Sequence, residues 1–159
     1  MKYRRLTKEQ FESLNKEFSL FLASYSIDKT KWNEILNNKN TKVDFFLDKF
    51  SELVWEESLS KEIYLLHLSK QQLFLFYCRK KIIDLILIKT DQFSIDFKSN
   101  DGWKWMLNNI KEGDVELFRS KKKYNNSREI EIFDLIQKGA SVDSGKLYKS
   151  IYSFLSNQP

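Results

Sequence analysis

The sequence of 159 residues contains one cysteine, one histidine and one proline, and its four glycines stand singly. A single cysteine excludes an intramolecular disulfide and favours a reducing compartment. It also excludes a closed thiolate zinc site, and one histidine leaves few ligands for an ordinary zinc centre. Isolated glycines provide neither a P-loop nor a dinucleotide-binding fingerprint. We therefore expect no metal ion and no cofactor.

Long apolar runs are missing as well. Asp84 interrupts the best candidate for a membrane span, which needs about 20 apolar residues. The N-terminus is basic, but Leu6 is followed by polar residues 7–10 instead of the apolar core of an export signal. These absences predict a cytoplasmic protein that does not insert into a membrane.

The most apolar part of the chain lies between residues 63 and 91. Three runs rich in branched and aromatic residues predict strands at 63–68, 73–78 and 82–88, although the first also fits the end of a helix. Both faces of the second run are apolar, which is typical of a strand covered on both sides. We expect a central hairpin of 73–78 and 82–88. Its connection lacks Gly and Asn, so we expect a loop longer than two residues.

Apolar residues at spacings of three and four predict five to six helices around these strands. Thr7 and Gln10 form the pattern of a capping box at the first helix, and Thr41 is the expected cap of the third. The expected helices are roughly 7–25, 28–36, 41–58, 99–111, 127–138 and 144–155, with a further strand near 115–120. Such blocks favour a single α+β domain over 1–159, with a small antiparallel sheet of three to four strands.

An acidic row marks one face of the third expected helix. Its members recur every four residues: Asp44, Asp48, Glu52 and Glu56. Such a row fits a cation or a basic partner surface. The alternative is a solvated face that is partly neutralised by Lys42 and Lys49 or by the basic loops of the same molecule.

The net charge of +5 comes from the middle of the chain, where residues 61–124 carry thirteen basic and eight acidic side chains. Two clusters produce this excess at the ends of expected strands. The first is Arg79, Lys80 and Lys81, and the second is Arg119, Lys121, Lys122 and Lys123, followed by Tyr124. If these ends coincide, they form one basic surface that suits RNA or DNA, with Tyr124 placed for stacking. Lysine-rich loops are also common as solubilising surface, and no recognised nucleic-acid-binding motif accompanies these clusters.

Cys78 and His67 are the only pair in the sequence that suggests nucleophilic catalysis. On neighbouring strands they would form a thiolate and imidazolium pair, with Cys78 as the nucleophile and His67 as the base of a hydrolase or transferase. The alternative is a small core cysteine and a polar side chain near a strand end. No oxyanion-hole signature accompanies the pair, which favours this alternative.

Six segments together resemble an uncharacterised family of short bacterial proteins. They are YRRLT at 3–7, FSELVWE at 50–56, YLLH at 64–67, LFLFYC at 73–78, EIFDLIQKGA at 131–140 and GKLY at 145–148. The resemblance covers nearly the whole chain. It implies a single cytoplasmic domain from a bacterium and brings no catalytic residue.

The sequence therefore predicts a non-enzymatic interaction module of a bacterial cytoplasmic complex. We expect a protein partner that contacts the two basic clusters, the acidic row or an exposed tryptophan. Binding of RNA or DNA by the basic strand ends is the alternative, and a Cys-His enzyme is a second one.

Overall fold

The structure is a computed structural model that describes residues 1–38, 42–61 and 63–157. The expected helix cap Thr41 and residue Glu62 lie outside these residues. The chain separates into two compact units, Met1–Ser60 and Lys61–Pro159, and each is described by itself. The expectation of a single domain stays a prediction.

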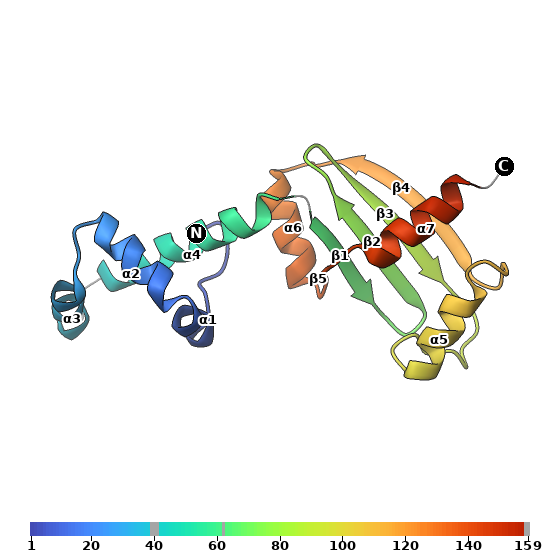
Figure 1. Ribbon diagram of the computed structural model, residues 1–159, viewed down its shortest axis with the longest axis horizontal. Coiled ribbons are helices and arrows are strands. Elements are labelled where there is room, and N and C mark those ends of the chain that lie inside the picture. The colour runs from blue at the N-terminus through green and yellow to red at the C-terminus, as the bar shows by residue number, and fades with distance from the viewer. Residues whose placement is uncertain (39–41, 62, 158–159) are drawn as a thin grey trace. The chain divides into compact units, whose positions relative to one another are not determined.

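The described residues of the N-terminal unit form four helices (Figure 1): α1 (Lys8–Ser13), α2 (Asn15–Ser24), α3 (Lys29–Asn37) and α4 (Lys42–Leu59). The predicted capping box is present, because Thr7 Oγ1 accepts from Gln10 N at 3.2 Å and Gln10 Oε1 accepts from Thr7 N at 2.8 Å. One continuous helix over 7–25 was wrong. The chain leaves helical geometry at Leu14, where φ is −104° and ψ is 22°. The Ser13 hydroxyl donates to the Gln10 carbonyl at 2.8 Å, a local bond that competes with the helical pattern.

Aromatic rings form the core of this unit around Phe50 on α4. Ring centroids of Phe18 and Phe21 lie 5.0 and 5.4 Å from that of Phe50, and Phe11 lies at 5.9 Å. Trp32 of α3 packs edge-on against Phe18 at 5.4 Å. The spacing of three and four in the sequence therefore places these rings on facing stripes, as expected of amphipathic helices.

A five-stranded antiparallel sheet forms the centre of the second unit. Its strands are β1 (Ile63–Leu68), β2 (Gln72–Cys78), β3 (Ile82–Lys89), β4 (Glu116–Lys123) and β5 (Ser141–Asp143), in the order β4-β3-β2-β1-β5. The predicted hairpin is confirmed, with Cys78 opposite Ile83 and Leu73 opposite Ile88. Residues 79–81 separate the two strands, and none of them has a positive φ. The Arg79 N–H donates to the Ile82 carbonyl at 3.0 Å, so the turn itself contains only Lys80 and Lys81, where a longer loop was expected.

Two counts differ from the expectation. The described residues form five strands and seven helices, where three to four strands and five to six helices were expected. The extra helix comes from the break at Leu14. The extra strand, β5, has only three residues and no apolar run, so its pairing with β1 leaves no periodic signal in the sequence.

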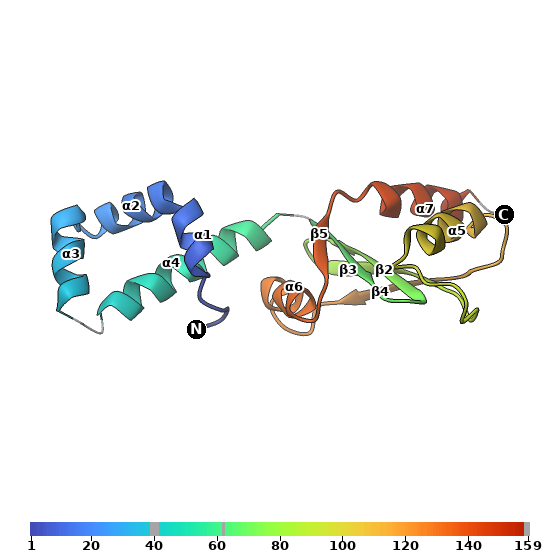
Figure 2. The same ribbon diagram turned by 90° about the horizontal axis from the view of Figure 1, so that it is seen from below.

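Helices cover the two faces of the sheet unequally (Figure 2). On one side lie α5 (Asn100–Asn109) and α7 (Lys146–Ser156), and on the other lies α6 (Arg128–Gln137). The main core fills the α5 and α7 side, where Leu75, Ile86, Ile88, Met106 and Ile151 are almost fully buried. On the α6 side Cys78 and Ile132 are fully buried, whereas Phe74 and Leu87 are only half-buried.

Candidate functional site

The structure does not bring Cys78 and His67 together. Ile63 is the residue of β1 that lies opposite Cys78, whereas His67 lies opposite Phe74, four residues further along β2. At about 3.3 Å per residue, this is a separation of about 13 Å along the strand. Cys78 has no exposed surface, and burial raises the pKa of its thiol to about 12, with Arg128 acting in the opposite direction. His67 packs against the ring of Phe74 at 5.9 Å. These positions are those of packing residues.

Among the described residues, no group of three or more His, Cys, Asp or Glu side chains is arranged to hold a metal ion.

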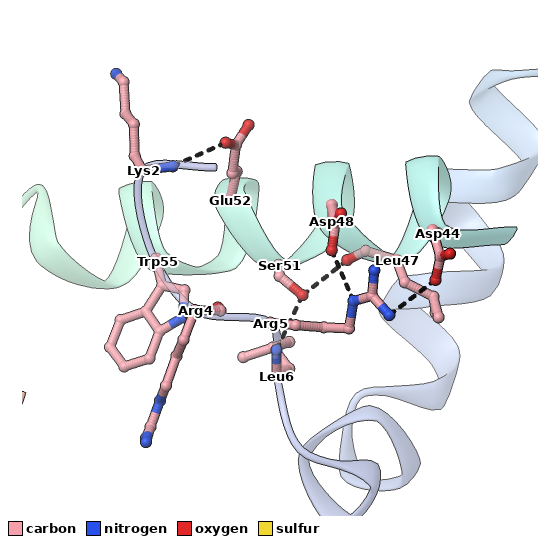
Figure 3. A network of polar contacts seen from close by, with 10 residues as sticks. All are labelled: Lys2, Arg4, Arg5, Leu6, Asp44, Leu47, Asp48, Ser51, Glu52 and Trp55. Atoms are coloured by element: carbon pink, nitrogen blue, oxygen red, sulfur yellow. Dashed lines mark hydrogen bonds and ion pairs between the residues drawn. The ribbon is translucent and has the colours of Figure 1, made fainter. Parts of the chain in front are cut away.

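The acidic row on α4 is engaged by the chain's own N-terminal segment (Figure 3). Arg5 Nε lies 2.6 Å from Asp48 Oδ1, and Arg5 Nη1 lies 2.9 Å from Asp44 Oδ1. Hydrogen bonding to Asp48, more than that to Asp44, raises the pKa of the Arg5 guanidinium against the opposing effect of burial. Lys2 serves the other end of the row, since its Nζ lies 3.3 Å from Glu56 Oε1 and its backbone N–H donates to Glu52 Oε1 at 3.3 Å.

Uncharged contacts fix the register of this segment on α4. The buried Ser51 hydroxyl accepts from Leu6 N at 3.0 Å and donates to the Leu47 carbonyl at 2.7 Å. Trp55 Nε1 donates to the Arg4 carbonyl at 3.0 Å (Figure 3). Tyr3 and Leu6 are buried between these polar contacts. The acidic row is therefore paired within the molecule. We call this attachment of residues 2–6 to α4 the internal clamp.

The two basic clusters converge. In the register of β3 and β4, Ile82 lies opposite Lys123 and Asp84 lies opposite Lys121. The Arg79–Lys81 turn thus lies beside the end of β4. Tyr124 joins the two, because its hydroxyl donates to the Arg79 carbonyl at 2.8 Å. This hydroxyl also lies 3.3 Å from the Ile82 carbonyl, and burial raises the pKa of Tyr124.

Arg128 is a structural position beside the basic clusters that the sequence analysis missed. Its guanidinium is buried and donates to three carbonyls: Arg79 at 2.9 Å, Cys78 at 3.1 Å, and Lys61. These bonds tie α6 to the turn between β2 and β3 and to the start of the unit. Sequence alone gives no signal for this role, because Arg128 follows the capping residue Ser127 like any polar residue of a first turn.

Only some of the basic side chains have a partner. Arg79 Nε lies 2.8 Å from Oδ2 of the buried Asp84, and the Tyr148 hydroxyl lies 3.4 Å from the same oxygen. Burial, followed by the charge of Asp84, raises the pKa of Tyr148 to about 12. Lys122 Nζ lies 3.4 Å from Glu131 Oε2, and the Arg119 guanidinium stacks over the Tyr152 ring at 4.6 Å.

Four exposed lysines remain: Lys80, Lys81, Lys121 and Lys123. Within the part of the chain that the structure describes, none of them has a carboxylate at ion-pair distance. We call these four residues the basic surface. It is carried by a turn and a strand end that lie side by side, and Tyr124 and Arg128 both bond to the backbone carbonyl of Arg79 in that turn.

A cleft of about 340 Å³ lies between α6 and the neighbouring face of the sheet. Phe76, Leu85 and Leu135 are among its apolar lining residues, and Ser120 and Lys122 of β4 also line it. Glu131 closes one side by accepting from the backbone N–H groups of residues 125 and 126. Burial alone would raise the pKa of Glu131, but these N–H groups and Lys122 outweigh it and hold the pKa below its usual value.

The strand β4 is an edge of the sheet, next to β3 only (Figure 1). Seven of its eight residues are exposed. Leu117, Arg119, Lys121 and Lys123 point to the face that carries α7, because their partners across β3 include core residues Ile86 and Ile88. The alternating residues Phe118, Ser120 and Lys122 point to the face of the cleft.

Comparisons with known proteins give a family but no activity. None of the helices in the described residues has the length and apolarity needed to cross a membrane. Neither the search among curated proteins nor the search among solved structures gave a significant match. The sequence profile of a family of unknown function, DUF6495, matches residues 1–156, which confirms the resemblance to an uncharacterised family. The chain therefore belongs to the DUF6495 family.

Proposed function

We propose that the protein is a non-enzymatic interaction module of the bacterial cytoplasm that binds an acidic protein partner through the basic surface. One observation carries the proposal: two clusters about 40 residues apart in sequence meet at one end of the sheet, and no carboxylate of the described residues lies at ion-pair distance from four of their lysines. The contrast with the acidic row supports it, since that row is already paired with Lys2 and Arg5.

The bonded backbone beneath the basic surface favours recognition over simple solubilisation. Two side chains from α6 and its preceding loop, Arg128 and Tyr124, bind the carbonyl of Arg79. A charged surface that is held in place before binding loses less conformational entropy when a partner arrives. Complementary charge also accelerates the encounter and makes it dependent on salt.

A labelled poly-L-glutamate of about twenty residues is a suitable probe, with fluorescence anisotropy as the readout. We expect binding at low salt that weakens as salt is added. The double substitution Lys121→Gln and Lys123→Gln should reduce the affinity by about tenfold or more. The matched control, Lys98→Gln and Lys104→Gln, removes two exposed lysines elsewhere in the same unit and should change the affinity less than about twofold. Absence of binding at low salt, or equal affinity of the two double variants, would contradict the proposal.

Single-stranded RNA or DNA is a second candidate partner, and an aromatic pair favours it. The rings of Phe74 and Phe76 lie parallel on the face that α6 covers only in part, 6.3 Å apart with an angle of 9° between them. Phe118 on β4 is exposed on the same face, with Lys89 Nζ 5.4 Å from its ring. Aromatic side chains beside lysines are the usual elements of sequence-tolerant binding to single strands.

An oligothymidine of about twenty nucleotides in the same assay separates the two candidates. If nucleic acid is the partner, it should bind more tightly than poly-L-glutamate at equal salt. Phe118→Leu should then weaken oligothymidine severalfold and leave poly-L-glutamate unchanged, because only the bases stack. Equal effects of Phe118→Leu on both probes would exclude a stacking role.

A further inference from the structure

We propose that the acidic partner binds as an extended segment that adds a sixth strand along β4, with acidic and apolar residues in alternation. This inference rests on the proposed function, since it specifies how an acidic partner meets the basic surface.

The first support is the open edge of β4. The strand has one neighbour, β3, and seven of its eight residues are exposed. A strand that pairs on one side presents a row of N–H and C=O groups on the other. For the described residues, no backbone hydrogen bond joins the outer edge of 116–123 to another segment. Main-chain groups of this kind are the means by which a sheet binds an extended peptide.

The second support is the difference between the two faces of β4. Arg119, Lys121 and Lys123 lie on one face. On the other face Ser120 is the small residue between Phe118 and Lys122, and it lines the apolar-floored cleft with Phe76. Successive side chains of an added strand would point to these faces in turn. Carboxylates on one face would meet the cations, and apolar side chains on the other would meet Phe118 and the cleft.

The lysines of β4 also influence which strands can pair with its open edge. Lysine on an edge strand prevents pairing with another edge, because like charges and desolvation oppose it. That barrier applies to a second copy of β4, which brings the same three lysines and Arg119. It is reversed for an acidic segment, for which the same side chains supply complementary charge. Charge therefore selects an acidic strand over a second copy of this chain.

Two peptides of about ten residues with identical composition test the proposal. One alternates Glu with Val and Thr, and the other carries the same residues in two blocks. Affinity is measured with the full chain, and amide exchange of residues 116–123 is followed by NMR with and without peptide. We expect the alternating peptide to bind about tenfold more tightly and to slow the exchange of alternate β4 amides by about tenfold or more.

The outcomes separate this inference from the proposed function. Equal affinity of the two peptides, or binding without slower exchange in β4, overturns strand addition. Failure of the alternating peptide to bind overturns it as well. In each case the proposed function stands if poly-L-glutamate binds in the manner described above. If poly-L-glutamate does not bind, the proposed function and the strand addition both fail.

Discussion

The acidic face of α4 and the basic surface on the sheet look alike in the sequence, as rows of like charge, but they differ in the structure. The acidic row meets Lys2 and Arg5 of its own chain. The basic surface keeps four lysines for which no described carboxylate lies at ion-pair distance. Like charges in a row are unfavourable by a few tenths of a kcal/mol per pair, so an internal partner of opposite charge reduces this repulsion. A row that keeps its repulsion is the better candidate for an external partner.

The sharpest test of this comparison removes Arg128, a buried basic side chain of the second unit that is bonded within the molecule. Arg128→Met should lower the free energy of unfolding by about 3 kcal/mol, because three carbonyls lose a charged donor. Lys121→Met, the matched control, should change stability by less than about 0.5 kcal/mol. Urea unfolding followed by circular dichroism measures both. Similar effects of the two substitutions would remove the distinction between buried and available cations.

The stability of the internal clamp is expected to depend most on an uncharged residue, Ser51. Ser51→Ala leaves the Leu6 N–H without its acceptor, and Ser51 is fully buried. We expect a loss of about 1.5 kcal/mol in the free energy of unfolding. Ser19→Ala removes an exposed hydroxyl that also bonds to a helix carbonyl, at Asn15, and should change stability little. A loss for Ser51→Ala no larger than that of the control would show that the N-terminal segment contributes little to this unit.

Ser51 and Arg128 also show which features of the structure could be predicted from the sequence and which could not. The hairpin 73–78/82–88 was predictable because apolar side chains on both faces of a short run are a local signal. The capping box at Thr7 was predictable for the same reason. The bonds of Ser51 to Leu6 and of Arg128 to Arg79 join residues 45 and 49 positions apart, and no spacing rule encodes them.

The basic surface could be predicted from the sequence only in part. Both clusters were visible in the sequence, and their position at strand ends was predicted. Whether they converge depends on the register of β3 and β4, with Asp84 opposite Lys121. That register is set by which side chains enter the core, such as Ile86 and Ile88, and it becomes known only with the whole sheet. Only when this register is known can the lysines that pair with a carboxylate be separated from those that do not.

Glu131 provides a test that depends on pH, because it is the internal carboxylate that pairs with Lys122 of the second basic cluster. Its pKa is lowered in the folded state, so its contribution to stability is fully present above the usual glutamate value of 4.5 and is lost as pH falls through the lowered pKa. Glu131→Gln should reduce the free energy of unfolding by about 1 kcal/mol at pH 7. At a pH below both pKa values the reduction should vanish. A reduction that does not diminish at any pH as the pH is lowered from 7 would mean that packing, not charge, accounts for the role of Glu131.

The smallest expected effect concerns the ion pairs of the acidic row. Arg5 and Asp48 are each more than a third exposed, so solvent screens the attraction between them. Arg5→Gln should lower the free energy of unfolding by about 0.5 kcal/mol at low salt and by less at high salt. A double-substitution cycle with Asp48→Asn isolates the coupling between the two side chains. Coupling near zero would mean that uncharged contacts, such as that between Ser51 and the buried Leu6, hold the N-terminal segment on α4 without help from this ion pair. The acidic row would then bind Arg5 too weakly to exclude an external basic segment. The two regions would differ only in that the acidic row is in contact with its own N-terminal segment, whereas no described carboxylate contacts the lysines of the basic surface.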